Sequence, residues 1–264
     1  MNKFYIQTAL FLLSIFAYAN NEILATEPAP GEDTKHQLRS RFATSEEIYE
    51  NNKHLSCSDN KHKRVINIMN EAVKQLEYYA TSKDGYEVYR QSPNDSISYY
   101  VKKIDDEASI LKVHLNIYAS SQYDDIINRL WDPNGSKIFN KGHARVAHVC
   151  NPNLLQIIQF CKKDSKHYQK YFCAFASKAE ISKDKTIIAM TSSNTSDSSH
   201  TYIEHENPIL KNTYTFVNSL NPKEHFANGR YVKVFVNLAG YLIEKKGDDL
   251  EITYIESIKG HSSV

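Results

Sequence analysis

Apolar and polar residues alternate along much of the chain between residues 97 and 257. The clearest segment spans residues 110–118, and its apolar positions are Leu111, Val113, Leu115 and Ile117, separated by Lys112, His114 and Asn116. A second segment, 231–243, repeats the alternation with valines. Because side chains of a strand point alternately to its two faces, this period predicts strands with one dry and one wet face.

Further segments of the same character predict a sheet of many strands. They are residues 97–101, 144–150, 154–162, 167–179, 186–191 and 250–257. Turns rich in Asn, Pro, Gly and Lys separate them, and residues 192–212 predict a long polar, serine-rich loop. Strands outnumber helices and no alternation of strand and helix is present, so the sheet is expected to be antiparallel.

In two stretches the apolar residues recur with the period of an α-helix. From His62 to Ser82 the apolar residues recur every three or four positions, and Gly85 ends the run. A second amphipathic stretch begins near Ser121 and reaches Trp131, where Asp132-Pro133-Asn134-Gly135 must end it. We therefore predict an α+β fold in which a curved antiparallel sheet and packed helices enclose a ligand cavity.

The N-terminus predicts secretion. Lys3 is the only charge in the first nineteen residues, residues 9–19 are nearly all apolar, and Ala17-Tyr18-Ala19 has the small-x-small pattern of a cleavage site. We expect a signal peptide over residues 1–19, cleaved after Ala19. Residues 20–59 then predict a flexible leader with a short helix at 44–51, and residues 60–264 the folded domain.

Charge argues against nucleic acid as a partner, and the cysteine spacing argues against a zinc site. With 32 basic and 31 acidic residues, the net charge of +1 falls to zero once Lys3 is removed, so nucleic acid is not an expected partner. The four cysteines show no zinc-binding spacing. We expect at most one disulfide, and a hairpin at residues 165–167 would bring Cys161 opposite Cys173.

Motifs of enzymes and metal sites are absent from the sequence. There is no G-x-S-x-G, no P-loop, no G-x-G and no H-E-x-x-H. The eleven histidines form no pair with metal-binding spacing; His143 and His148, and His200 and His205, are five apart. We therefore predict a protein that is not an enzyme and needs no cofactor or metal.

Several segments resemble START-related lipid-binding domains. They are DDIINRLWDP at 124–133, YFCAFA at 171–176, DKTIIAMT at 184–191, VNLAGYLI at 236–243 and ITYI at 252–255. The leader NNEILATEPAPGED at 20–33 and the block NEAVKQLEYYA at 70–80 more narrowly resemble the fam-a proteins of malaria parasites. This resemblance implies a helix-grip fold around a lipid cavity. It also implies a secreted protein, exported beyond the parasite into the host cell, that contacts membranes transiently and binds or transfers phospholipids such as phosphatidylcholine.

One departure from the resemblance concerns the C-terminus. START-related domains end with a long helix that closes the cavity, whereas this sequence stops at residues 260–264. We therefore expect that helix to be missing and one side of the cavity to be open.

Candidate cavity residues follow from strand parity. We predict that Phe175, Ile188 and Phe235 line the cavity and that Trp131 lies above them on its helix. Two other hypotheses remain open. One is a secreted or surface interaction module that keeps the fold without lipid transfer. The other is an enzyme of the wider helix-grip class, such as a cyclase, for which His114 lies on a strand but among its polar positions.

Overall fold

The architecture is taken from a computed structural model of the chain, which describes residues 42–92, 96–135, 144–160, 169–192, 194–196, 205–211, 215–217 and 231–259. The helices are α2 Ser45–Asn51, α3 Asp59–Thr81 and α4 Tyr123–Trp131, with short 3₁₀ turns η1 Lys53–Leu55 and η2 Ser120–Gln122. The first strands are β1 Glu87–Gln91, β2 Ile97–Lys103, β3 Ser109–Ile117, β4 Ala144–Asn151, β5 Leu154–Phe160 and β6 Gln169–Ser182. The remaining strands are β7 Lys185–Ser192, β8 Asn194–Ser196, β9 Thr215–Val217, β10 Tyr231–Lys233, β11 Phe235–Lys246 and β12 Asp249–Lys259.

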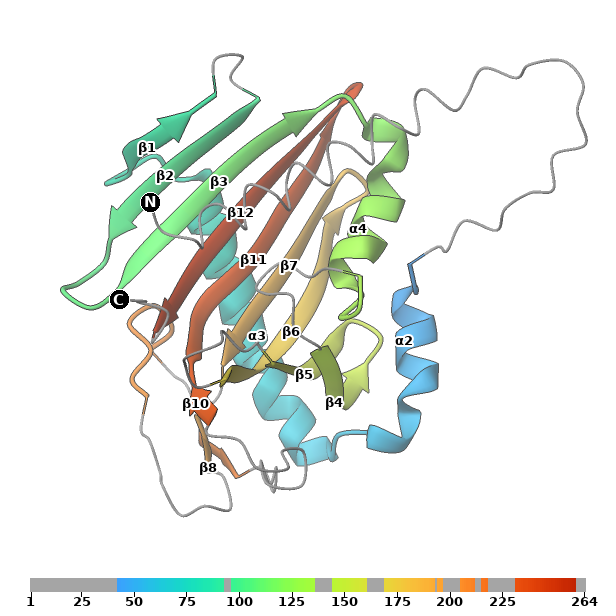
Figure 1. The fold of residues 1–264 in the computed structure, drawn as a ribbon. Helices are drawn as coiled ribbons and strands as arrows, with labels where there is room; N and C mark the ends of the chain where they lie inside the picture. The colour runs from blue at the N-terminus through green and yellow to red at the C-terminus, as the bar shows by residue number, and fades with distance from the viewer. Residues whose placement is uncertain are drawn as a thin grey trace, which may run out of the picture.

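One large curved sheet dominates the described residues (Figure 1). Its strand order is β1-β2-β3-β12-β11-β7-β6-β5-β4, and every neighbouring pair along that path is antiparallel. The short β10 adds to β6 in parallel, and β8 and β9 form a separate two-stranded sheet. The structure is therefore α+β with a large antiparallel sheet and few helices, as the sequence predicts.

Helices cover both faces of this sheet. Helix α3 crosses one face, and α4 and α2 lie against the other (Figure 1). We call these the α3 face and the α4 face. Because both are covered, β5 is buried along its whole length, and so are β7 after its first residue and the first nine residues of β11. The predicted wet face of residues 231–243 is therefore wrong, although β3 keeps partly exposed polar positions at His114 and Asn116.

The α3 face is held by a run of apolar residues on α3 that pack onto β7, β11 and β12. Those of the helix include Val65, Met69, Ala72, Leu76 and Ala80, and those of the strands include Ile187, Leu238, Leu242 and Ile255. Gly240 of β11 makes the close approach possible. A Cβ at this position would lie 1.9 Å from the carbonyl oxygen of Ile188 and 2.7 Å from Cδ1 of Leu76.

The segment before α3 is tied to the sheet, which corrects the predicted disulfide and moves the start of packed structure ahead of residue 60. Cys57 forms a disulfide with Cys150 of β4, whereas Cys173 is buried and forms no disulfide, and Cys161 lies outside the described residues. The backbone N–H of Cys57 also donates to the carbonyl oxygen of Val149 at 3.0 Å. Spacing alone could not reveal this bridge, because its cysteines are 93 residues apart.

Helix α2 belongs to the same packed segment. Thr44 caps it by accepting from the backbone N–H of Glu47, whose side chain in turn accepts from the N–H of Thr44. Ile48 is buried among residues of the α4 face. Residues 42–58 are therefore part of the packed structure rather than of a flexible leader.

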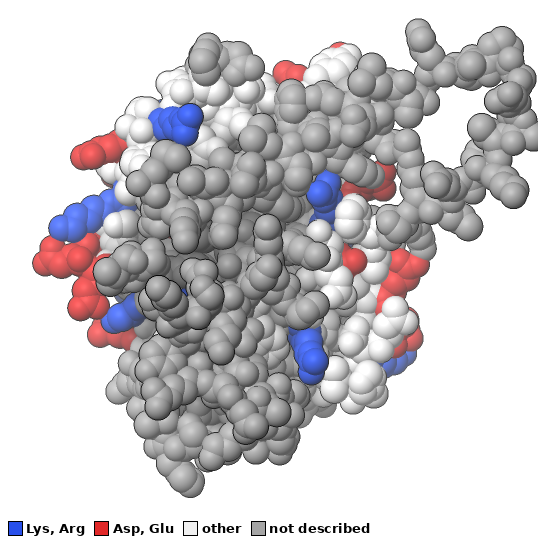
Figure 2. All heavy atoms as spheres, in the orientation of Figure 1, with Lys and Arg blue, Asp and Glu red and all other residues white. Residues whose placement is uncertain are grey.

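Charged side chains of both signs are mixed on the surface. In Figure 2, acidic and basic side chains of described residues lie mixed along both margins of this view, over the β1–β2 edge and around α2. Within the described residues, no helix combines the length and the apolar character needed to cross a membrane.

Candidate functional site

A small, partly open cavity lies between α4 and the sheet. Its volume is about 50 Å³, and its lining comes from the end of α4 and from β4, β5, β6, β7 and β11. The lining includes Leu130 and Trp131 of α4, Ile157 and Gln159 of β5, and Ile188, Met190 and Tyr241 of the central strands. No described lining residue carries a charge, so the cavity suits an uncharged part of a ligand.

Helix α4 forms the roof of the cavity and is anchored at both ends. Its buried residues are Tyr123, Ile126, Ile127, Leu130 and Trp131, which recur at helical spacing and so form one apolar stripe. At the first turn the Tyr123 hydroxyl donates to Oγ1 of Thr186 on β7 at 2.9 Å. After the last turn Asp132 accepts from the backbone N–H of Asn134 at 2.8 Å and of Ala43 at 3.3 Å. The roof is therefore joined to β7 and to the segment before α2.

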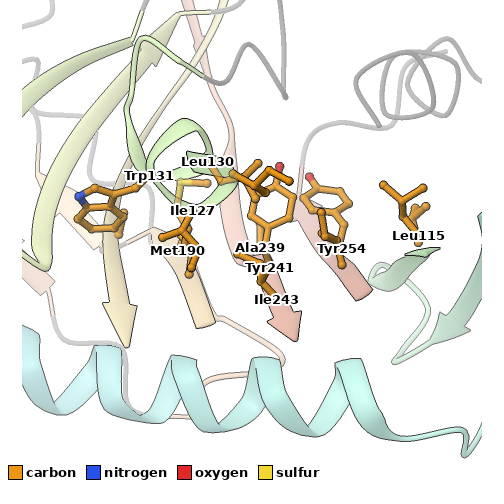
Figure 3. Packing of buried hydrophobic residues seen from close by; sticks show 14 of the residues in the cluster. Leu115, Ile127, Leu130, Trp131, Met190, Ala239, Tyr241, Ile243 and Tyr254 are labelled. Atoms are coloured by element: carbon orange, nitrogen blue, oxygen red, sulfur yellow. The ribbon is translucent and has the colours of Figure 1, made fainter. Parts of the chain in front are cut away.

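Among the described residues, two polar atoms of the lining have no hydrogen-bond partner. They are Nε1 of Trp131 and the hydroxyl oxygen of Tyr241, and both side chains are 3% exposed. Figure 3 shows them on the side of the sheet away from α3, Trp131 arriving from α4 and Tyr241 from β11. Burial raises the pKa of Tyr241 well above its usual value, so its hydroxyl stays protonated at physiological pH.

A buried acid lies close to this cavity. The ring of Tyr254 on β12 is 5.1 Å from that of Tyr241, and the Tyr254 hydroxyl donates to the carboxyl group of Glu256. Burial raises the pKa of Glu256 to about 8, and the hydrogen bond from Tyr254 opposes that rise. Glu256 shares strand parity with Ile252 and Tyr254, which both lie on the α4 face, so alternation along β12 could have identified it.

Of the four predicted cavity residues, two line the cavity and two lie elsewhere. Trp131 and Ile188 line the cavity. Phe175 points to the α3 face, because Ala174 and Ala176 take the α4 face of β6. Phe235 stacks on His205, with ring centroids 4.4 Å apart, and belongs to neither main cluster. Their part in lipid binding stays a prediction for Trp131 and Ile188, and the geometry replaces Phe175 and Phe235 with Tyr241 and Met190.

A second hollow, of about 560 Å³, lies beside α3 and residues 209–211. Its walls include Glu71, Gln75 and Lys211 beside Ile68 and Leu210. It is not enclosed between helix and sheet, and its polar walls suit acyl chains poorly. We therefore take the cavity under α4 as the candidate site.

Neither a metal-binding cluster nor the histidine considered for acid–base catalysis is found at this cavity among the described residues. Across the described ranges, no cluster of three or more His, Cys, Asp or Glu residues is arranged to hold a metal ion. His114 lies on the opposite side of β3 from Val113 and Leu115, and its Nδ1 is 3.1 Å from Oγ1 of Thr253. The histidine considered for an acid–base role therefore does not point to the cavity.

Comparison with known proteins supports the fold. No protein family and no curated sequence matches the chain. Among solved structures, human StAR-related lipid transfer protein 5 matches with a TM-score of 0.52 at 11% identity, over 78% of this chain and 86% of that one. Human STARD10 matches with a TM-score of 0.50 at 12% identity, over 73% of this chain and 68% of that one. The chain thus has a START-like, helix-grip fold.

Proposed function

We propose that this protein binds a phospholipid of the phosphatidylcholine type and transfers it between membranes. The observation that carries the proposal is the uncharged cavity between α4 and a START-like sheet. Such a cavity removes acyl chains from water, and each methylene buried contributes about 0.8 kcal/mol. The activity is physical transfer, and no covalent bond is made or broken.

The size of the cavity sets a requirement on the mechanism. A volume of about 50 Å³ is far below the roughly 300–1,000 Å³ of cavities that hold small molecules. A lipid therefore enters only when the roof moves away from the sheet. Helix α4 forms the roof, so its displacement opens the site, and the hydrogen bonds of Tyr123 and Asp132 at its two ends must break or act as pivots when it moves.

Secretion is part of the proposal. It is supported by the signal-peptide pattern of residues 1–19 and by the Cys57–Cys150 disulfide, because such bonds form and persist in oxidising compartments. Membership of the fam-a family and export into the host cell rest on the sequence resemblance at residues 20–33 and 70–80.

The decisive experiment is mass spectrometry of lipids that co-purify with residues 20–264, followed by transfer of labelled phosphatidylcholine between vesicles. We expect bound phospholipid and protein-dependent transfer. Ala176→Leu fills the cavity and should reduce both, whereas Ala179→Leu on the other face of β6 should reduce neither. Thermal melts check that both variants fold.

An interaction module without lipid transfer is the second candidate. A folded protein that carries no lipid and transfers none in this experiment would favour it. The observation on its side is that the cavity under α4 is small as it stands.

A further inference from the structure

We propose that the Cys57–Cys150 disulfide is a redox switch that controls how readily α4 moves away from the sheet and releases lipid. The inference rests on the proposed function and adds the regulation of that same site. Residues 42–58 are joined to β4 by the disulfide near one end and contact the end of α4 near the other. The bond therefore acts on the roof of the cavity through this segment.

The C-terminal part of segment 42–58 lies along the edge strand β4. Besides the disulfide, the backbone N–H of Cys57 donates to the carbonyl oxygen of Val149 at 3.0 Å. Nδ1 of His148 lies 3.3 Å from the carbonyl oxygen of Leu55. These polar contacts are few and lie in a partly exposed region, so the position of the segment depends chiefly on the covalent bond.

The N-terminal part of the same segment contacts the last turn of α4 (Figure 1). The backbone N–H of Ala43 donates to Oδ2 of Asp132 at 3.3 Å. The guanidinium carbon of Arg129 lies 5.4 Å from the centre of the Phe42 ring, and a Cβ at Gly135 would lie 2.9 Å from Cδ1 of that ring. This is the end of α4 that lines the cavity, so loss of these contacts loosens the roof directly above it.

Helix α2 connects the two ends of the segment. Thr44 and Glu47 cap its first turn, so the helix holds its own shape. Ile48 is its one fully buried apolar residue, and Tyr49 is partly buried against the same core. A helix of seven residues with so little buried surface is held weakly by packing. Its position therefore follows from the attachments on either side of it.

The disulfide is open to reduction, because Cys57 and Cys150 are both partly exposed. One thiolate of a dithiol attacks one cysteine sulfur, the S–S bond breaks, and the other cysteine leaves as a thiol. The second thiolate of the dithiol then attacks its own first sulfur and releases the remaining cysteine. The protein gains two electrons and two protons, and the dithiol becomes a disulfide. The proposed export from an oxidising secretory pathway into a host cell leads to a compartment that keeps thiols reduced.

The test uses residues 20–264, the chain that remains after the proposed cleavage, folded under oxidising conditions. The protein is loaded with fluorescent phosphatidylcholine, and transfer to vesicles of unlabelled phosphatidylcholine is timed before and after treatment with dithiothreitol. Mass spectrometry of alkylated peptides establishes the state of each cysteine. We expect reduction to speed transfer about tenfold, the factor that corresponds to losing one hydrogen bond and one cation–π contact.

Variants test the route from the disulfide to the roof. Cys57→Ser with Cys150→Ser should transfer at the fast rate with or without dithiothreitol, whereas Cys173→Ala should behave as the wild type. Phe42→Ala removes the contact with Arg129, so it should transfer faster than the wild type while oxidised, and reduction should then add less. Glu50→Ala, on the exposed side of α2, is the matched control and should change neither the rate nor its response to reduction.

Hydrogen exchange separates release of the roof from loss of the fold. Reduction should speed exchange at residues 42–58 and 123–135 and leave α3 and β11 protected. Trp131, the only tryptophan, should shift its emission to longer wavelength as the end of α4 loosens. Faster exchange throughout the sheet together with loss of lipid would show a purely structural crosslink and overturn the proposal. Equal transfer rates in the two redox states would overturn it while leaving lipid carriage intact, whereas no bound lipid in either state would overturn both.

Discussion

Gly240 lies where β11 packs closely against both β7 and α3. Its φ of +147° and the 1.9 Å that would separate a Cβ from the Ile188 oxygen both exclude a side chain. Gly240→Ala should therefore lower the free energy of unfolding by about 3 kcal/mol or more, from backbone strain and overpacking together. Denaturant titration measures the change.

The control for this prediction is Gly247→Ala in the β11–β12 turn. Gly247 also has a positive φ, of +63°, but a Cβ there would meet nothing within 4 Å. It should cost only about 1 kcal/mol. Equal losses at the two glycines would mean that close packing against α3 is unimportant.

Glu256 makes stability depend on pH. Its folded pKa of about 8 lies above the usual value of 4.5, so the folded state holds a proton that the unfolded state releases. The stability that this proton provides is complete below about pH 4.5 and is lost as the pH rises to about 8. Over that interval the unfolding free energy of the wild type should fall relative to Glu256→Gln by up to about 1.4 kcal/mol per pH unit.

Melts of both proteins between pH 5 and pH 9 measure this difference. Glu87→Gln, on the exposed strand β1, serves as the control and should track the wild type. A constant difference between wild type and Glu256→Gln across the range would show that the Glu256 carboxyl is charged in the folded protein.

The orientation of single residues was the part of the site that sequence reasoning predicted least well. Alternation identifies two faces of a strand but not which helix covers each of them, and here both faces are apolar. Phe175 was therefore placed on the wrong side. Phe235 lies just before a register shift between Val236 and Leu238, which changes the parity of β11, and a bulge of this kind leaves no clear mark in the sequence.

At the scale of elements, the Cys57–Cys150 disulfide fixes the segment before α3 to the edge strand β4. In the chain-entropy picture, a loop of 93 residues closed by this bond adds about 4.6 kcal/mol of stability. Cys57→Ser with Cys150→Ser should therefore melt well below the wild type and expose residues 42–58 to protease. Cys173→Ala, which removes a thiol that forms no disulfide, is the control, and peptide mapping that joined Cys173 to another cysteine would contradict the assignment.

Most elements could be predicted from period alone. The helices predicted at 62–82 and 121–131 correspond to α3 and α4, and the strands at 97–101, 110–118 and 186–191 correspond to β2, β3 and β7. Strand β1 was missed, because all of its residues are exposed and no alternation marks it. The predicted hairpin at 165–167 lies outside the described residues.

At the scale of the whole molecule, Trp131 reports on the joint between helix and sheet. It is the only tryptophan and is 3% exposed, so its emission in the lipid-free protein should be blue-shifted. Phospholipid vesicles should change that emission in the wild type and not in Ala176→Leu. Water-like emission before any lipid is added would mean that α4 does not cover the sheet in solution.

The position of β12 has a consequence for how the molecule is made. This strand comes last in the described chain yet lies between β3 and β11, where it joins β1, β2 and β3 to the rest of the sheet (Figure 1). During synthesis the two parts exist before the strand that connects them, each with an apolar edge unpaired. The ribosome must therefore release nearly the whole domain before its sheet can close, and the interval until then is when the nascent chain most needs a chaperone.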